Sequence, residues 1–310
     1  MRAKLARWYD SAKRDLPWRR TRDPYAIWIS EVMLQQTRVA TVIPYYQRFL
    51  KRFPDPAALA GAPEPDLLAL WSGLGYYSRA RNLQKGAKQI MERGGFPATY
   101  AALLELAGVG AYTAAAIASI SYGLPHAVVD GNVRRVLARL TNDGHADTQA
   151  VANELLDRRD PARWNQAVME LGATICLPRE PRCGACPLRS ECKARKAGTQ
   201  KDLPLQKAKP APEHLERTLL VIRQRGRILL TPSERVTGFW DLPEPFAAAR
   251  KGAIVGEFRH TITHRHYRFT VLEGSTMQAP RHSRWHAEKE LERIPLSTTA
   301  RKALKLYDSL

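Results

Sequence analysis

Apolar residues recur with helical spacing through roughly the first 171 residues of the chain, and alternating Val, Ile and Thr runs of the kind found in strands are scarce there. This spacing predicts an amphipathic helix on each side of a polar junction at Gln36–Thr37, with Pro44 tolerated in the first turns of the second helix. Further helices are predicted over residues 63–71 and 79–94, on both sides of a Gly-rich hairpin within residues 99–123, and over residues 131–141 and 162–176. The first part of the chain is therefore predicted to be mainly helical.

The pattern changes after Cys192. Residues 193–215 are rich in Lys, Pro and Ala and lack apolar periodicity, which predicts an exposed linker. Beyond it we expect two strands joined by a turn at Arg225–Gly226, a second strand pair within residues 252–274, and a final helix from about Ser297. The predicted organisation is a helical domain over 1–192, a linker over 193–215, and a small α+β domain over 216–310.

Charge is the strongest signal of composition. The 310 residues carry a net charge of +19, and basic residues exceed acidic ones on both sides of the predicted linker. A broadly basic surface favours a polyanionic partner, above all nucleic acid, although generic basic character is the alternative. The N-terminal segment lacks an apolar signal region, and no stretch approaches the ~18 apolar residues that a spanning helix needs. We therefore expect a cytoplasmic protein, associated with the nucleoid, without a membrane partner.

The only four cysteines fall within one short segment, with the spacing C-x6-C-x2-C-x5-C: Cys176, Cys183, Cys186 and Cys192. Thiols clustered this closely in a reducing compartment favour one metal centre over two disulfides. Four cysteine ligands suit either a [4Fe–4S] cluster or a structural zinc ion. The basic residues around the loop suit phosphate contacts as well.

Three further motifs contain candidate functional residues. Gly108 and Gly110 lie between two predicted helices, where backbone N–H groups at a helix start can bind a DNA phosphate, although an ordinary tight turn fits equally well. Asp130 follows an apolar run at the start of a helix, where a simple N-cap is the alternative. Glu31 lies among apolar residues of a helix, where partial desolvation would raise its pKa for use as a general acid. An exposed position on the polar face is the alternative for Glu31.

Taken together, these motifs resemble a known group of DNA repair enzymes. The cysteine spacing, and the glycine hairpin followed by VDGN at residues 129–132, resemble the endonuclease III superfamily of DNA glycosylases. The segments SEVMLQQTRV and WSGLGYYSRARNL narrow the resemblance to its adenine DNA glycosylase (MutY) family. The resemblance implies a [4Fe–4S] cluster, a general-acid role for Glu31 at adenine N7, and a catalytic carboxylate at Asp130. Bifunctional relatives carry a lysine where this chain has Tyr112, so the resemblance implies a monofunctional enzyme.

Glycosidic chemistry suggests how these residues act. Glu31 would protonate adenine, and ionised Asp130 would stabilise or trap the oxocarbenium-like sugar after the base is flipped out of the duplex. Tyr112 and Asn132 are expected to hold Asp130 in place. The resemblance also assigns residues to the two bases, each with core packing as the alternative. Trp18, Arg19, Leu34 and Gln166 match the adenine pocket, and Gln36, Thr37, Leu74 and Tyr76 match positions around the opposing 8-oxoguanine.

The C-terminal domain resembles a Nudix fold through TGFWDLPE at residues 237–244, but the clustered glutamates of a Nudix hydrolase do not follow. The resemblance implies a lesion-recognition domain in which Ile262, Thr263 and His264 occupy a contact loop. Ile262 replaces an aromatic residue there, while Thr263 keeps a hydroxyl donor. A metal site formed by His260, His264 and His266 on one strand face is the alternative, and no carboxylate or cysteine accompanies these three residues.

The sequence thus predicts a monomeric, monofunctional DNA glycosylase that excises adenine opposite 8-oxoguanine or guanine in double-stranded DNA during base excision repair. Two alternatives remain: a related glycosylase acting at G·T mismatches, and a non-catalytic Fe–S DNA-binding protein. A nucleotide hydrolase is disfavoured because the Nudix glutamates are missing.

Overall fold

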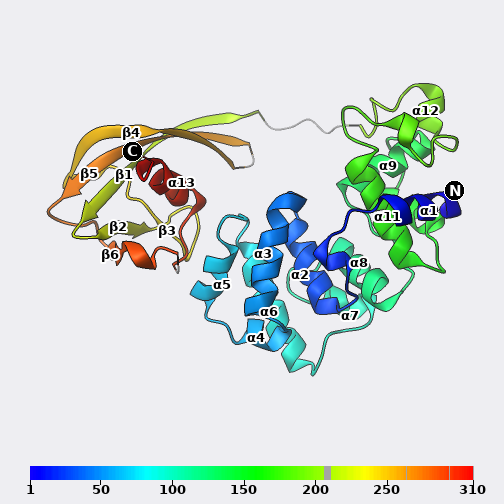
Figure 1. Cartoon of the computed structure of the whole chain (residues 1–310), viewed down its shortest axis with the longest axis horizontal. Coiled ribbons are helices and arrows are strands. Elements are labelled where there is room, and N and C mark those ends of the chain that lie inside the picture. Colours follow the sequence, from blue (N-terminus) through cyan, green and yellow to red (C-terminus); the bar gives the residue numbers. More distant parts are fainter. Residues whose placement is uncertain (206–210, 263, 293, 310) are drawn as a thin grey trace. The chain divides into compact units, whose positions relative to one another are not determined.

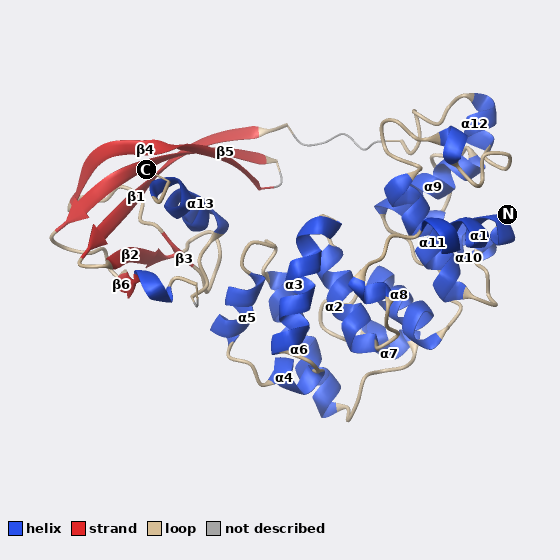
Figure 2. Cartoon of the chain, viewed as in Figure 1, coloured by secondary structure: helices blue, strands red, loops and turns tan. Residues whose placement is uncertain are grey.

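The computed structural model describes residues 1–205, 211–262, 264–292 and 294–309. The chain forms two compact units, shown in Figure 1 and, by secondary structure, in Figure 2. The first unit comprises Met1–Ala60 and Asn82–Lys207, and the second comprises Gly61–Arg81 and Ala208–Leu310. Within the described residues, no helix is long and apolar enough to cross a membrane.

The first unit is helical, as predicted. Its helices are α1 (Arg2–Ala12), η1 (Pro17–Arg19), α2 (Pro24–Leu34), α3 (Val39–Arg52), α4 (Pro56–Ala60), α6 (Ser78–Glu92, which begins in the second unit), α7 (Tyr100–Leu104), α8 (Ala111–Tyr122), α9 (Gly131–Thr141), α10 (Thr148–Leu155), α11 (Pro161–Thr174), η2 (Cys183–Ala185) and α12 (Lys193–Ala197). The predicted polar junction lies between α2 and α3, and the predicted glycine hairpin lies between α7 and α8.

Helix α2 forms the centre of this unit. Asp23 caps it by accepting hydrogen bonds from the backbone N–H groups of Tyr25 and Ala26, and Pro24 occupies its first turn. Every residue from Tyr25 to Met33 is buried, and the helix packs against α3 and α8. The predicted amphipathic character is therefore wrong for α2, because its neighbours cover it on all sides. Any polar side chain on α2 is consequently drawn into the core.

The predicted linker is shorter than residues 193–215. Helix α12 begins at Lys193, and Ala194 within it is fully buried. Leu203 is also buried, and its carbonyl accepts a hydrogen bond from the Arg139 guanidinium. At the other end, β1 already begins at Glu213. Apolar contacts of the few hydrophobic residues thus order much of a segment whose composition suggested a loop.

The second unit is an α+β domain, as predicted. Its elements are α5 (Glu64–Trp71), β1 (Glu213–Gln224), β2 (Arg227–Pro232), β3 (Trp240–Asp241), β4 (Ala249–Ile262), β5 (Arg265–Thr276), β6 (Arg284–Ala287), η3 (Glu288–Glu290) and α13 (Thr298–Tyr307). The strand order is β3-β2-β1-β5-β4, and β6 also pairs with β2. The turn between β1 and β2 falls at Arg225 and Gly226, both with positive φ, as expected for a two-residue hairpin.

Residues 61–81 group with the second unit, although the sequence placed them in the helical domain. The Tyr77 ring packs on Phe239 with centroids 3.8 Å apart. The Ser72 hydroxyl donates a hydrogen bond to the Leu296 carbonyl at 2.8 Å and accepts one from Arg301. These partners lie more than 150 residues away along the chain, which explains why local sequence patterns did not reveal the grouping.

The predicted single strand face with three histidines is wrong. His260 lies on β4, His266 lies on β5, and His264 lies in the turn between them. In the antiparallel register His260 pairs with Tyr267 and Thr261 pairs with His266. Among the described residues, no three His, Cys, Asp or Glu side chains converge as a single metal ion requires.

A buried carboxylate ties the last helix to the sheet. Asp241 on β3 is 3% exposed and accepts hydrogen bonds from the hydroxyls of Ser297 and Ser233 and from the Arg235 guanidinium. The same Ser297 hydroxyl caps α13 by accepting a hydrogen bond from the Ala300 N–H. Ser297 therefore serves both the helix start and the buried charge.

We predict that Ser297→Ala lowers the free energy of unfolding by roughly 1–3 kcal/mol, because it removes the cap of α13 and one donor to a buried carboxylate. Chemical denaturation of the purified protein measures this change. Ser275→Ala, at an exposed position of β5, should stay within about 0.5 kcal/mol of the parent. Equal effects of the two substitutions would contradict the role given to Ser297.

Candidate functional site

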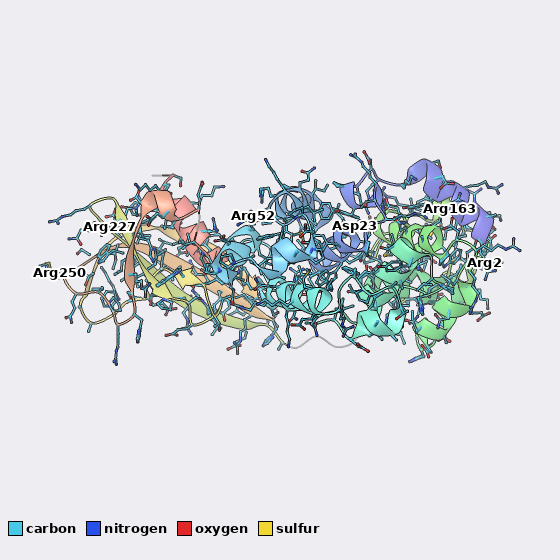
Figure 3. The ribbon with its side chains drawn as sticks, turned by 90° about the horizontal axis from the view of Figure 1, so that it is seen from below. Arg2, Asp23, Arg52, Arg163, Arg227 and Arg250 are labelled. Carbon is cyan, nitrogen blue, oxygen red and sulfur yellow. The ribbon has the colours of Figure 1, made fainter. Side chains whose placement is uncertain are left out.

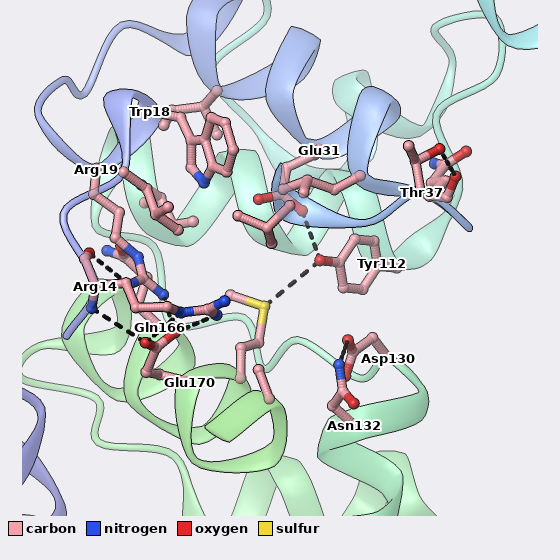
Figure 4. A pocket seen from close by; sticks show the side chains of 18 of the residues that line it. Arg14, Trp18, Arg19, Glu31, Thr37, Tyr112, Asp130, Asn132, Gln166 and Glu170 are labelled. Carbon is pink, nitrogen blue, oxygen red and sulfur yellow. Dashed lines mark hydrogen bonds and ion pairs between the residues drawn. The ribbon is translucent and has the colours of Figure 1, made fainter. Parts of the chain in front are cut away.

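A cavity of about 540 Å³ in the first unit is lined by most of the residues predicted to act in catalysis or to contact a base (Figure 4). It is formed by η1, by α2 and the junction after it, and by the residues at or near the starts of α8 and α9, with α11 opposite. The predicted residues that line it are Trp18, Arg19, Glu31, Leu34, Gln36, Thr37, Tyr112, Asp130, Asn132 and Gln166. Segments more than 100 residues apart along the chain thus meet in one place.

Glu31 is the buried carboxylate of this cavity. It is 5% exposed, and Tyr112 donates a hydrogen bond to its Oε2 at 2.6 Å. Burial raises the pKa of Glu31 to about 7, assisted by the negative charge of Asp130, while the Tyr112 hydrogen bond and the positive charge of Arg19 act in the opposite direction. Near neutral pH a large fraction of the molecules therefore carries a proton on Glu31 that this group can donate.

Asp130 combines the two roles that the sequence left open. Its Oδ1 accepts a hydrogen bond from the Val133 N–H at 2.6 Å, so it is the N-cap of α9, and it also lines the cavity. Its Oδ2 accepts a hydrogen bond from Asn132 Nδ2 at 3.2 Å, as predicted. The expected contact of Tyr112 with Asp130 is replaced, because the Tyr112 hydroxyl donates to Glu31.

Asn165 on α11 orders the segment that leads to Asp130. This residue is 3% exposed; its Nδ2 donates to the His126 carbonyl and to the Ser119 hydroxyl, and its Oδ1 accepts from the Val128 N–H. Three hydrogen bonds from one buried amide fix the chain just before the carboxylate. Sequence reasoning missed Asn165, because an isolated Asn in a helix shows no local sign of such distant partners.

Three more residues of the cavity were also missed: Arg14, Met169 and Glu170. The Glu170 side chain is fully buried, yet the hydrogen bonds and charge of Arg14 and Arg19 outweigh the effect of burial and lower its pKa to about 2. Glu170 lies one helical turn after Gln166, so the i, i+4 spacing on α11 was a signal that could have found it. Met169 accepts a long contact from the Tyr112 hydroxyl at 3.5 Å.

The glycine hairpin has the conformation that the sequence suggested. Gly108 adopts a φ of +75°, and a Cβ placed there would lie 2.6 Å from the Cβ of Asn82, so only glycine fits. Gly110 is the N-cap residue of α8, which begins one residue before Tyr112. The hairpin thereby sets where Tyr112 enters the cavity. A phosphate contact at Gly108 and Gly110 stays a prediction.

The four cysteines line a single small cavity of about 30 Å³. A lone zinc ion needs all its thiolates within about 2.3 Å of one point, and the cysteines do not converge in this way within the described residues. Four thiolates also suit an iron–sulfur cluster, which offers a separate iron to each of them. Burial raises the pKa of the Cys186 thiol to about 11, so metal binding must displace a proton there.

Two buried arginines of α9 connect the cysteine loop with the carboxylate at the start of the same helix. Arg135 donates to the Cys176 carbonyl at 2.7 Å and to Asn132 Oδ1 at 2.9 Å, and Asn132 in turn donates to Asp130. One turn later, Arg139 donates to the carbonyls of Leu177 and Pro178 and to Cys176 Sγ. The backbone of the cysteine loop is thus linked to Asp130 by an unbroken chain of hydrogen bonds.

The remaining predicted contacts lie elsewhere. Leu74 and Tyr76 line a cavity of about 500 Å³ within the second unit, together with the end of β4 at His260–Ile262. Tyr76 is 47% exposed and has a left-handed φ of 49°. His264 is exposed in the turn between β4 and β5, and Thr263 lies outside the described residues.

Comparison with known proteins identifies the family of the chain. Residues 29–160 match the family model of HhH-GPD superfamily base excision DNA repair proteins. The chain is 35% identical to the adenine DNA glycosylase of Homo sapiens over 99% of its own length and 73% of that protein. It is 46% identical to the adenine DNA glycosylase of Rattus norvegicus, over 72% of this chain but only 46% of the rat protein.

The helical unit also has solved structural relatives. A thermostable thymine-DNA glycosylase superimposes with a TM-score of 0.59 at 29% identity, over 63% of this chain and 94% of that one. This match covers the fold of the helical unit, whereas the human sequence match extends over almost the whole chain. The chain therefore belongs to the adenine DNA glycosylase family, within the HhH-GPD superfamily of base excision DNA repair enzymes.

Proposed function

We propose that this protein binds duplex DNA, flips out an adenine that lies opposite 8-oxoguanine or guanine, and cleaves its N-glycosidic bond. The observation that carries the proposal is the presence of two carboxyl groups with different environments in one cavity. Glu31 is buried with a pKa of about 7, whereas both oxygens of Asp130 accept hydrogen bonds, one from the Val133 N–H and one from Asn132. One group is suited to donate a proton and the other to stabilise positive charge.

The proposed reaction begins with the flipped adenine in the cavity. Glu31 donates its proton to the adenine ring at N7, which makes the base a better leaving group. As the C1′–N9 bond breaks, the sugar becomes oxocarbenium-like, and the Asp130 carboxylate stabilises it until water attacks C1′. The water forms the new C1′–O bond and loses its proton to the Glu31 carboxylate, which restores the acid for the next turnover. Products are free adenine and an abasic site.

A strand-cleaving activity of the Schiff-base type is not part of the proposal. No lysine is among the described residues that line the cavity, and Tyr112, which occupies the position of the lysine in bifunctional relatives, donates its hydrogen bond to Glu31. We therefore propose a monofunctional enzyme. We also propose that it acts as a monomer on double-stranded DNA, in the cytoplasm at the nucleoid.

We also propose that Cys176, Cys183, Cys186 and Cys192 hold a [4Fe–4S] cluster. When bound, the cluster would supply a rigid crosslink for the loop, with no redox chemistry on the substrate. Arg135 and Arg139 donate hydrogen bonds to the backbone of the cysteine loop, and Arg135 also donates one to Asn132, which lies beside Asp130. Basic side chains around the loop suit contacts to DNA phosphates.

Basic side chains occur on both units. Figure 3 shows Arg2 on a helix of the first unit, and Arg227 and Arg250 on strands of the second. With a net charge of +19, binding to DNA should weaken steeply as salt increases. We also propose that Gln36 and Thr37 of the first unit contact the base opposite the adenine. In the second unit, we propose a contact with this base for Leu74, Tyr76 and His264.

A second candidate substrate is thymine at a G·T mismatch, because a thymine-DNA glycosylase shares the helical fold at 29% identity. The human and rat adenine glycosylases are more similar to this chain, at 35% and 46% identity. Adenine is therefore the substrate that we favour.

We predict that single-turnover excision releases adenine from a duplex with adenine opposite 8-oxoguanine, and that the strand breaks only after hot alkali. Glu31→Gln and Asp130→Asn should each lower the rate at least ~100-fold, because each removes a proton-transfer or charge-stabilising group. Glu154→Gln, an exposed carboxylate on α10, is the matched control and should leave the rate unchanged. Activity on a G·T duplex alone would reassign the substrate, and near-parent rates in both variants would refute the proposal.

The pKa of Glu31 predicts a pH dependence. A general acid is active while protonated, so excision should fall as pH rises through about 7. Tyr112→Phe removes a hydrogen bond that favours the Glu31 carboxylate, so the pKa rises and the falling limb of the pH–rate profile moves to higher pH. Tyr122→Phe, at the end of the same helix, should leave the limb in place. A limb that moves to lower pH in Tyr112→Phe would contradict this assignment.

We predict that the protein reconstituted with iron and sulfide binds close to four irons per chain and absorbs broadly near ~400 nm. Cys186→Ser should lose iron and lower stability, because the loop then loses a ligand that orders it. Ser190→Ala, in the same loop, should keep the full iron content. Purified protein with stoichiometric zinc and no iron after reconstitution would argue for the zinc alternative.

A further inference from the structure

The cavity contains a third carboxylate to which the proposed reaction assigns no role. Glu170 on α11 has a fully buried side chain, and both of its oxygens bind arginines. Arg14 contributes its Nε at 2.8 Å from Oε1 and its Nη2 at 2.8 Å from Oε2, and Arg19 contributes its Nη2 at 2.7 Å from Oε2. Burying a carboxylate together with two guanidinium groups costs free energy, because the charged groups lose their contacts with water.

Arg19 is the member of this triad that affects the proposed acid. Its positive charge lowers the pKa of Glu31, although burial dominates, and only 13% of its side chain is exposed. Three contacts hold the Arg19 guanidinium at its present position: Nη1 donates to the Arg14 carbonyl, Nη2 donates to Glu170, and the group lies 5.5 Å from the centre of the Tyr9 ring. Of these partners only Glu170 carries a full negative charge.

Charged and titratable groups lie on both sides of Arg19, which also lines a smaller cavity with Asp10 and Asp160. Tyr112 faces Glu31 from α8, Asp130 from the start of α9, and Arg19 from η1. If Glu170 were neutral, the remaining carboxylates that line the cavity with Arg19 would be Glu31 and Asp130. An arginine attracted to Glu31 would favour the ionised form of this acid and remove the proton that catalysis requires.

We propose that Glu170 is a positioning residue that holds Arg19 on the wall of the cavity, so that the guanidinium does not form an ion pair with the Glu31 carboxyl group. The inference deepens the proposed function and rests on it for its meaning in catalysis. The arrangement lets the cavity keep a guanidinium beside the flipped base without an ion pair to the general acid. Arg14 shares the charge of Glu170 and stays beside it, with its backbone N–H also donating to Oε1.

The test is the pKa of Glu31, measured by ¹³C NMR of labelled glutamate carboxyl groups in the intact protein, with Glu31→Gln used to assign the signal. In Glu170→Gln this pKa should fall by about one unit, the scale expected when a cation moves next to a carboxylate. The falling limb of the pH–rate profile for adenine excision should move to lower pH by the same amount. An unchanged or raised Glu31 pKa would overturn the proposal.

Three controls separate positioning from a general loss of structure. Arg14→Gln leaves the Glu170–Arg19 pair intact, so the Glu31 pKa should stay at the parent value. Glu154→Gln removes an exposed carboxylate on α10 and should also have no effect. In an Arg19→Gln background, adding Glu170→Gln should cause no further fall, because the cation that moves is gone. The same fall with or without Arg19 would overturn the proposal.

Two further outcomes have defined meanings. If Glu170→Gln does not fold, Glu170→Asp keeps the charge but shortens its reach by one methylene, and the Glu31 pKa should then fall by a smaller amount in the same direction; no fall would overturn the proposal. If the parent protein does not excise adenine, the proposed function fails. The NMR titration still decides whether Glu170 controls Arg19 and the Glu31 proton, because this reading does not depend on turnover.

Discussion

The burial of Glu31 on α2 is the constraint on which the site depends. Helix α2 is covered on every side, so the Glu31 carboxyl group has little access to water and its pKa rises to about 7. Because burial disfavours the charged form of Glu31, it raises the fraction of this group that is protonated near neutral pH and can act as an acid. Tyr112 limits the effect by donating a hydrogen bond at 2.6 Å. The site therefore depends on the packing of the core around α2, and not on exposed side chains.

The Asp130 carboxylate is held in place by hydrogen bonds at the start of a helix. Asp130 caps α9: a backbone N–H group donates a hydrogen bond to one carboxylate oxygen, and Asn132 donates one to the other. The helix that it caps is fixed in turn to the cysteine loop by Arg135 and Arg139. The order of the loop and the orientation of the carboxylate are thus connected through one helix.

Charge in the cavity is balanced by pairs. Arg19 and Arg14 share Glu170, so the guanidinium groups that line the cavity are partly neutralised before any DNA binds. Buried ion pairs of this kind contribute little net stability, but removing one partner leaves a costly unpaired charge. Their value lies in fixing side-chain positions. In the second unit, Asp241 has a similar structural role for the start of α13.

Much of this protein could be predicted from the sequence. Apolar spacing located most helices and both hairpin strands, and glycine and proline marked the junctions, because these signals are local. The cysteine spacing and the motifs around Glu31, Tyr112 and Asp130 indicated the family. Only the tertiary structure decided that Tyr112 donates its hydrogen bond to Glu31 instead of Asp130, and that Glu170 and Asn165 support the site. It also decided that residues 61–81 group with the C-terminal domain. These features depend on contacts between residues far apart along the chain, whose hydrogen bonds and burial leave no periodic trace in the sequence.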